Sequence, residues 1–355
     1  MAPQESDANA VLFEHDVETE DVALMKTPVQ QAGDSKWETH YEWHIIFLIP
    51  LIYTAGVYGG YLFLVSATWQ TKIFTIFLYV TSALSVTVGS HRLWSHKAFK
   101  AKWPLQLILM FFHTSALQFS VINWVRDHRM HHKYVDTDAD PHNVTRGFFF
   151  SHVGWVMMGK HPEYERKSKG LDISDVENNP ILQFQQKYYL ILATIICFIL
   201  PTVIPVYFWN ETWINAILVP GMFHRFCVYN AIGLVNSALH TWGYKPYDKD
   251  MAATELRMVN YVLLGEYAHN YHHAFPWDYR TSELSTFTSF SLTTAVIDFF
   301  AKIGWAYDLK TISDDVVRKR VMRTGDGSHQ IWGWGDKDQT KEEVNATVRI
   351  HPKHD

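Results

Sequence analysis

Four long apolar runs alternate with polar segments along this chain. They span residues 45–65, 73–90, 188–209 and 213–235. The first three contain no charged side chain, and the fourth is interrupted only by His224 and Arg225. An apolar helix of about 18 or more residues is long enough to cross the hydrocarbon core of a bilayer. The pattern therefore predicts an all-α membrane protein with four transmembrane helices, paired into two hairpins with tight turns at 66–72 and 210–212.

The polar segments around these runs indicate the domain organisation and the orientation. Residues 1–40 are polar and acidic, which argues against a cleavable signal peptide and predicts a disordered tail. We expect a membrane domain over 41–310 and a C-terminal tail over 311–355. The stretch between the second and third runs carries thirteen Lys and Arg residues, whereas the two tight turns carry only Lys72. Under the positive-inside rule, this stretch and both tails are cytosolic.

Histidines gather in three short clusters, each beside an apolar stretch. The clusters are His91 with His96, His128 with His131 and His132, and His269 with His272 and His273. Neutral imidazole is the commonest metal ligand, and the spacing i, i+3, i+4 puts each triplet on one face of a helix. Asn236 and His240 lie one helical turn apart at the end of the last run. Nine histidines and one asparagine are too many ligands for one ion. We therefore predict a centre with two ions, each bound by four or five nitrogens and keeping an open position.

A fifth apolar stretch, residues 104–123, is also long enough to cross the membrane. If it crossed, the first and second histidine clusters would lie on opposite sides of the membrane and could not share a metal. We therefore interpret this stretch as lying on or within the protein near the membrane interface. A fifth span is the alternative.

The remaining composition narrows the chemistry of the predicted centre. The two cysteines, Cys197 and Cys227, fall within predicted spans and are expected in the core. We therefore do not expect cysteine thiolates among the metal ligands. Imidazole suits zinc, copper, iron and nickel, and a hydrolytic zinc site would use fewer histidines and a carboxylate base. An all-nitrogen centre with two ions beside a lipid-facing wall favours redox-active iron and O₂. Isolated histidines are interpreted as residues of the membrane interface: His113, His152, His161 and His224. The net charge of −5 and the lack of a basic face argue against a nucleic-acid partner.

Five motifs together resemble the membrane acyl-CoA (stearoyl-CoA) desaturase family, and most of all its insect branch. They are HRLWSH (91–96), WVRDHRMHHKYVDTDADPHN (124–143), RGFFFSHVGW (146–155), NSALH (236–240) and GEYAHNYHHAFPWDY (265–279). The resemblance implies four transmembrane helices with a cytosolic helical catalytic cap in the endoplasmic reticulum membrane. It implies a fatty acyl-CoA substrate, O₂, two iron ions, and electrons from cytochrome b5 and its NADH-dependent reductase. The nine clustered histidines would bind iron directly, and Asn236 would act through a water.

The same resemblance implies the substrate contacts. Arg126, Asp127 and Lys160 match positions that contact the CoA group. Gln118 and Trp124 match the bend of the acyl tunnel, and Tyr79 and Ala83 match its closed end. The chain departs from the family at Phe119 (usually Asn), Ile232-Gly233 (usually Thr-Trp) and Gly159 (usually Arg). We therefore expect a shifted double bond, for example delta-11 as in pheromone precursors, or an altered chain length, in place of a plain delta-9 product.

Two other classes of protein remain as alternatives. A histidine-box lipid hydroxylase or sterol oxidase would use similar metals but insert oxygen, and the mass of the product distinguishes it. A metal transporter or a seven-helix receptor would place ionisable residues near the middle of its spans. Here the histidine clusters lie at the ends of the predicted spans, which disfavours a non-enzymatic role.

Overall fold

The computed structural model describes residues 40–283, 291–329 and 341–347, and these residues are mostly helical. Apart from His40, the predicted N-terminal tail lies outside the described residues, and so does most of the segment beyond residue 329. The helices and strands described all belong to one compact unit that begins at His40.

Four continuous helices of the described chain are long and apolar enough to cross a membrane, as predicted. The first is α2 (Trp43–Val65), and the second joins α3 (Trp69–Leu84) to the π-helical η1 (Ser85–Ser95). The third comprises α10 (Tyr189–Ala193), η4 (Thr194–Ile199) and α11 (Leu200–Trp209). The fourth comprises α12 (Trp213–Ala216), η5 (Ile217–Phe223), α13 (His224–Asn236) and η6 (Ala238–His240). Large apolar side chains cover their outer surfaces, and Leu190 and Phe208 are each 80% exposed, as expected of helices that face lipid.

The two hairpins pack closely through small residues and join at their turns. At Gly59 of α2, an added Cβ would lie 2.1 Å from the main-chain oxygen of Leu218, so only glycine permits this approach. Glu211, between α11 and α12, accepts hydrogen bonds from the main-chain N–H and the hydroxyl of Thr68 and from the hydroxyl of Thr71. These bonds connect the turn of the second hairpin to the start of α3.

A buried arginine connects the two π-helical segments of the second hairpin. The Arg225 guanidinium donates hydrogen bonds to the main-chain oxygens of Cys197 in η4 and Gly221 in η5, and it lies over the ring of Phe198. His224 beside it is also fully buried, so its interpretation as an interface residue is wrong. The two cysteines are free, as predicted.

The fifth apolar stretch contains a sharp bend. It forms α4 (Trp103–Ala116), which is bent by 81° from α5 (Val121–Lys133). The fourteen residues of α4 extend about 21 Å, less than the roughly 30 Å core of a bilayer. Because the bend returns the chain to His128, whose Nε2 lies 2.9 Å from that of His96, the first two histidine clusters are on the same side.

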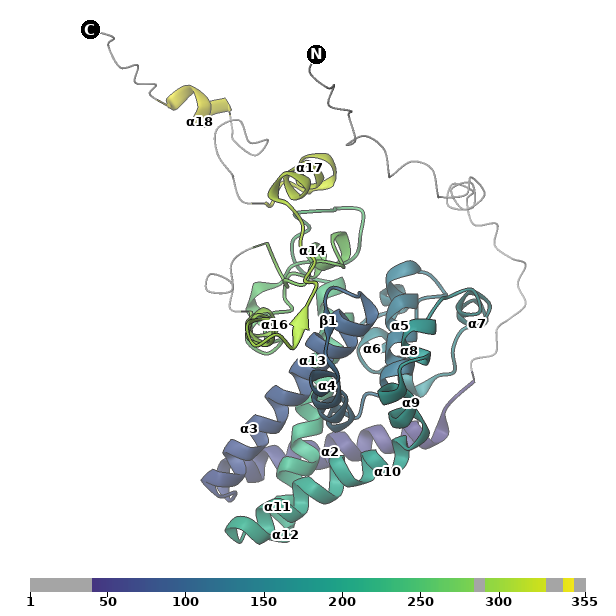
Figure 1. Ribbon diagram of the computed structural model, residues 1–355, viewed down its shortest axis with the longest axis vertical. Coiled ribbons are helices and arrows are strands. Elements are labelled where there is room, and N and C mark those ends of the chain that lie inside the picture. The colour runs from purple at the N-terminus through teal and green to yellow at the C-terminus, as the bar shows by residue number, and fades with distance from the viewer. Residues whose placement is uncertain (1–39, 284–290, 330–340, 348–355) are drawn as a thin grey trace, which may run out of the picture. The chain divides into compact units, whose positions relative to one another are not determined.

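Apart from the last short helix, the other elements form a cap around the ends of these helices. Between α5 and α10 lie η2 (Val144–Arg146), α6 (Phe148–His152), η3 (Gly154–Met157), α7 (Pro162–Ser168), α8 (Ser174–Glu177) and α9 (Pro180–Lys187). After η6 come η7 (Arg257–Val259), α14 (His269–Ala274), α16 (Leu292–Lys302), α17 (Asp314–Thr324) and α18 (Lys341–Ala346). Figure 1 shows α2, α3, α11 and α12 gathered at one end of this unit and α14 and α16 toward the other.

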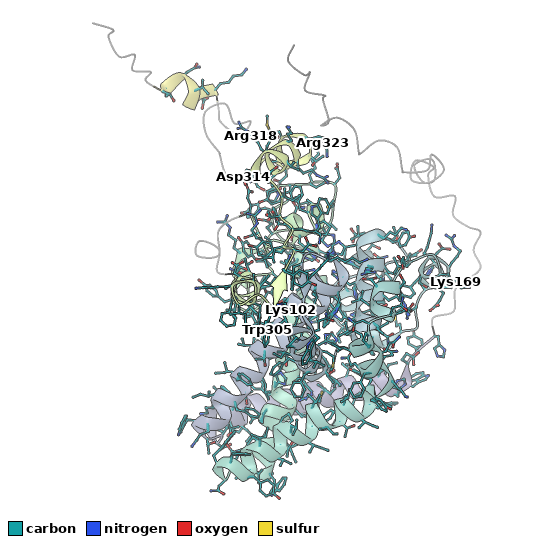
Figure 2. The ribbon with its side chains drawn as sticks, in the orientation of Figure 1. Lys102, Lys169, Trp305, Asp314, Arg318 and Arg323 are labelled. Carbon is teal, nitrogen blue, oxygen red and sulfur yellow. The ribbon has the colours of Figure 1, made fainter. Side chains whose placement is uncertain are left out.

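A short antiparallel pair joins the two halves of the cap. β1 (Lys100–Ala101) pairs with β2 (Ala306–Tyr307). The N–H of Lys102 donates to the main-chain oxygen of Trp305, and Figure 2 shows these two residues together. Part of the segment predicted as a C-terminal tail is α17, whose Val317 and Val321 are buried against the aromatic side chains around α14.

Candidate metal centre

Helical segments from four parts of the chain carry the predicted histidines. His91 lies in η1 and His96 directly follows it, so the second long helix continues past the predicted span and holds the first cluster. The second triplet lies on α5, which begins at Ser120, where the side chain accepts a hydrogen bond from the N–H of Asn123. His240 ends η6, and the third triplet lies on α14.

All nine histidines converge in two groups. The first group is His91, His96, His128, His132 and His272. The second group is His131, His240, His269 and His273. In each group the candidate ligand atoms all lie within 4.8 Å of one another. Asn236 ends α13 one turn before His240, and its role through a water stays a prediction.

Each helical triplet contributes to both groups. On α5, His128 and His132 join the first group, while His131 joins the second. On α14 the arrangement is reversed, because His272 joins the first group while the other two histidines join the second. Residues i and i+4 of a helix point in nearly the same direction, and residue i+3 lies to one side of them. Each helix therefore contributes two histidines to one group and one histidine to the other, so α5 and α14 together connect the two groups.

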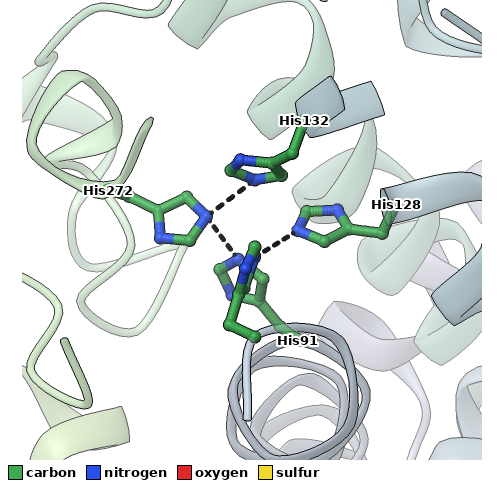
Figure 3. Close-up of side chains that lie close together, drawn as sticks. His91, His128, His132 and His272 are labelled. Carbon is green, nitrogen blue, oxygen red and sulfur yellow. Dashed lines mark hydrogen bonds between the residues drawn. The ribbon is translucent and has the colours of Figure 1, made fainter. Parts of the chain in front are cut away.

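The spacing of the ring nitrogens fits a shared metal ion. In the first group, the Nε2 of His272 lies 2.8 Å from that of His91 and 3.0 Å from that of His132, as Figure 3 shows. In the second group, the Nε2 of His269 lies 3.0 Å from that of His240. Nitrogens bound about 2.1 Å from one ion at tetrahedral or octahedral angles are about 3.0–3.4 Å apart.

An orphaned nitrogen supports the same conclusion for the second group. His131 is buried, and its Nε2 has no hydrogen-bond partner among the described residues. Its Nδ1 lies 2.9 Å from a carboxylate oxygen of Asp140. Because a carboxylate accepts, Nδ1 carries the proton, and the lone pair of Nε2 is left to face the group. The residues present therefore fit a metal ion held by imidazole nitrogens.

Burial keeps most of these rings neutral. It lowers the pKa of His269 to about 3. Burial, helped by neighbouring imidazoles, also holds the pKa of His128, His132, His272 and His273 well below its usual range. At pH 7 these side chains therefore offer lone pairs instead of positive charge.

Carboxylates outside the two groups orient the rings, and sequence reasoning had not singled them out. Asp140 holds His131 and also accepts from the N–H groups of Asp136 and His142, which fixes its position. Glu266 lies 3.5 Å from Nδ1 of His91 and accepts a hydrogen bond from Arg92 at 3.0 Å. The signal was present, because both acids lie within the motifs that contain the second and third histidine clusters.

An apolar wall leads up to the first group. Tyr79, Trp124 and Ile232, three of the predicted tunnel residues, pack against the same buried cluster. Trp124 also stacks on the ring of His128, with centroids 4.7 Å apart. Ala83, one turn after Tyr79, is buried, whereas Gln118 lies half-buried in the turn between α4 and α5. The wall therefore places apolar, largely aromatic surface beside the histidines.

The predicted CoA residues line one cleft of about 540 Å³ together with Phe119. Lys160 donates to Asp127 at 2.8 Å and lies over the rings of Trp155 and Tyr164. Arg126 pairs with Glu177 at 3.3 Å. Gly159 also lines this cleft, so the charge that the resemblance leads one to expect there is absent.

The glycine of the Ile232-Gly233 pair allows the cap to approach α13 closely. A Cβ at Gly233 would lie 2.8 Å from the main-chain oxygen of His152 and 2.9 Å from its ring. The His152 ring lies within hydrogen-bonding distance of Asn230 on α13, at 3.2 Å, and of Ser237 directly after α13, at 2.9 Å. A large side chain at this position would displace the segment that leads to Trp155 in the cleft.

Several known proteins are similar in sequence to this chain over most of its length. The family model for fatty acid desaturases matches residues 67–289. An acyl-CoA Delta-9 desaturase of Acheta domesticus is 49% identical over 353 residues, which cover 98% of each chain. An acyl-CoA Delta(11) desaturase of Spodoptera littoralis is 50% identical over 90% of this chain and 93% of the relative. An acyl-CoA Delta12-desaturase of Acheta domesticus is 47% identical over 97% of both. The chain therefore belongs to the fatty acid desaturase family, and within it to the acyl-CoA desaturases of insects, which are oxidoreductases.

Proposed function

We propose that this protein introduces a double bond into a saturated fatty acyl-CoA, with O₂ as oxidant and two iron ions held by the nine histidines. In the balanced reaction, one –CH₂–CH₂– unit loses two hydrogens, and O₂ takes these with two external electrons and two protons to give two waters. Bound iron would supply the one-electron chemistry with O₂ that an unactivated C–H bond requires. The observation that carries the proposal is the convergence of nine histidines beside an apolar wall in a member of this family.

The chain's own residues position the substrate and exclude water. The acyl chain would lie along the wall formed by Tyr79, Trp124 and Ile232. Because Trp124 stacks on His128, a methylene held against this wall lies next to the first group. Tyr79 donates a hydrogen bond to the main-chain oxygen of Val262 at 2.6 Å, which fixes its ring where the far end of the chain would stop. Such fixed walls place one C–C bond in reach of the metals.

The cleft at the surface would hold the CoA group. Lys160 and Arg126 offer an ammonium and a guanidinium to the phosphates, and Asp127 holds Lys160 in place. A planar guanidinium also stacks on an adenine ring. Gly159 removes one cation from this surface, so we expect weaker binding of the CoA phosphates than in relatives with arginine there.

We propose that the double bond is shifted from delta-9, for example to delta-11, or that the preferred chain length is altered. The names of the relatives cover Delta-9, Delta(11) and Delta12 activities at nearly equal identity, so identity alone does not select a position. Phe119 lines the cleft, Ile232 lies in the wall, and Gly233 sets the approach of the cap. Changes at these points alter how far the chain reaches past the metals.

We also propose a multi-pass position in the endoplasmic reticulum membrane with the centre and both termini in the cytosol. Both tight turns lie at the ends of the long helices away from the histidines, and the cationic segments lie on the histidine side. The external electrons would come from NADH through a reductase and cytochrome b5.

Lipid analysis of a desaturase-deficient yeast that expresses this chain tests the proposal. New monounsaturated acyl chains are expected, and dimethyl disulfide derivatisation with mass spectrometry locates the double bond. Products heavier by one oxygen would instead identify a lipid hydroxylase. A purely delta-9 C16 and C18 profile would contradict the shifted position.

A matched pair of variants tests the metal assignment in the same cells. His132→Ala should abolish the new products while the protein stays in the membrane, because the apolar helices carry the fold. Lys133→Ala, at the adjacent exposed position, should retain activity. Substantial turnover by His132→Ala would show that this ligand assignment is wrong.

A further inference from the structure

His113 on α4 has partners at both ring nitrogens. It is fully buried, with Nδ1 2.7 Å from the hydroxyl of Ser90 and Nε2 3.1 Å from the main-chain oxygen of Phe119. The complete burial of His113 shows that its interpretation as a residue of the membrane interface is wrong. One ring thus spans the space between the metal-bearing helix η1 and the turn that follows α4.

The partners determine the tautomer of this ring. A main-chain carbonyl only accepts hydrogen bonds, so Nε2 of His113 carries the hydrogen and donates it to Phe119. Nδ1 then has the lone pair and accepts from the hydroxyl of Ser90. Both nitrogens of a neutral imidazole are satisfied, which holds the ring in one orientation.

The first partner directly precedes a candidate ligand. Ser90 is fully buried and is followed in η1 by His91, a member of the first histidine group. Its main-chain oxygen accepts a hydrogen bond from Ser95 at 2.7 Å. Ser90, beside His91, is therefore held by two bonds: its main-chain oxygen accepts from Ser95, and its hydroxyl donates to His113.

The second partner belongs to a strained turn at the substrate cleft. Phe119 has φ +60° and Leu117 has φ +55°, both in the left-handed region. Such conformations cost non-glycine residues about 1–2 kcal/mol each. The bond from His113 helps to hold this turn, while the Phe119 side chain lines the cleft with Arg126 and Lys160.

We infer that His113 is a positioning residue that sets the register between the cleft wall at Phe119 and the metal-bearing helix at Ser90, and thereby the carbon at which the double bond forms. This inference rests on the proposed desaturase function. The wall at Phe119 contacts the substrate near the CoA end, and η1 presents His91 to the reacting carbon. A change in their separation moves a different C–C bond under the metals without removing a ligand.

Near-isosteric substitutions separate the two links. The side-chain oxygen of His113→Asn can replace Nδ1 as the acceptor for Ser90, but its amide does not reach Phe119. The longer His113→Gln places an N–H donor near the position of Nε2 and preserves the link to Phe119. His113→Ala removes both links. Leu107→Ala, on the exposed side of α4, is the matched control.

For each variant, the positional isomers of the monoene products are measured in desaturase-deficient yeast. The iron content per protein is measured after purification. His113→Asn and His113→Gln each break one of the two links, so the ratio of major to minor isomer should fall about fivefold in both, the effect of one neutral hydrogen bond on a conformational population. In His113→Ala, which loses both links, the ratio should fall at least as far. Leu107→Ala should keep the wild-type ratio, and all variants should keep the wild-type iron content.

The outcomes distinguish this inference from a structural role and from failure of the proposed function. Unchanged isomer ratios in His113→Ala and His113→Asn, with only less protein or less total product, would refute the inference. A loss of iron from these variants in proportion to their loss of activity would also refute the inference. If the His113→Ala protein does not accumulate, the isomer ratios of His113→Asn and His113→Gln test the inference in its place. Absence of monoenes from the wild type and from Leu107→Ala would instead refute the desaturase function, and the inference with it.

Discussion

Glu211 holds the two helical hairpins together at their turns, and its replacement by glutamine should destabilise the protein. The carboxylate is 4% exposed. One oxygen accepts from the N–H and the hydroxyl of Thr68 and from the hydroxyl of Thr71, at 2.9, 2.8 and 2.6 Å. The other accepts from the N–H of Thr212 at 2.9 Å and the amide of Asn215 at 3.0 Å. Glutamine would direct its own NH₂ group at two or three of these donors.

The magnitude follows from the pKa of this carboxyl group. Burial alone would raise it, but the hydrogen bonds from Thr71, Thr68, Asn215 and Thr212 outweigh burial and lower the pKa from 4.5 to about 2. At about 1.4 kcal/mol per pKa unit, this difference corresponds to about 3 kcal/mol of folding free energy. Because the folded-state pKa is the lower one, this stabilisation is complete above pH 4.5 and is lost as the pH falls toward 2.

Thermal unfolding in detergent micelles measures the effect. Glu211→Gln should be less stable than the wild type by about 3 kcal/mol at pH 7, and this difference should fall to about half at pH 3. Glu163→Gln is the control, because its ion pair with Arg166 is exposed and should contribute no more than about 0.5 kcal/mol. Equal stability of Glu211→Gln and the wild type at pH 7, or a difference that does not change with pH, would refute the reasoning.

Three further substitutions test other parts of the structure. Gly233→Ala should lower thermal stability by about 1–3 kcal/mol, because its Cβ overlaps the main-chain oxygen of His152; His152→Ala should not restore it, and a wild-type melting temperature would contradict the overlap. Arg225→Leu should cost at least about 2 kcal/mol by removing two hydrogen bonds to buried main-chain oxygens, and an unchanged melting temperature would show that these bonds do not stabilise the fold. Asp140→Asn should weaken iron binding by the purified apoprotein about 10- to 100-fold, because Asp140 orients the His131 ring; unchanged affinity in an iron titration would exclude this role.

The long helices and the histidines of the centre could be predicted from the sequence alone. The four apolar runs correspond to the four long helices because about twenty apolar residues have few stable arrangements other than a helix in lipid. The histidine count required more than one ion, and the observed groups contain five and four rings. The histidines before and after residues 104–123 can share a centre only if this stretch does not separate them. The 81° bend between α4 and α5 satisfies this requirement.

How these parts combine depends on contacts between segments that are distant in the sequence. Periodicity puts His128, His131 and His132 on one face of α5, but it does not say that the middle one faces a different group, since that depends on where α14 crosses. Asp140 and Glu266 lie within the motifs, but the rings that they contact, and the two bonds of His113, do not follow from spacing along the chain. A hydrogen bond or a ligand direction is set by side chains from distant segments within a few ångströms, and local spacing along one chain does not contain that distance.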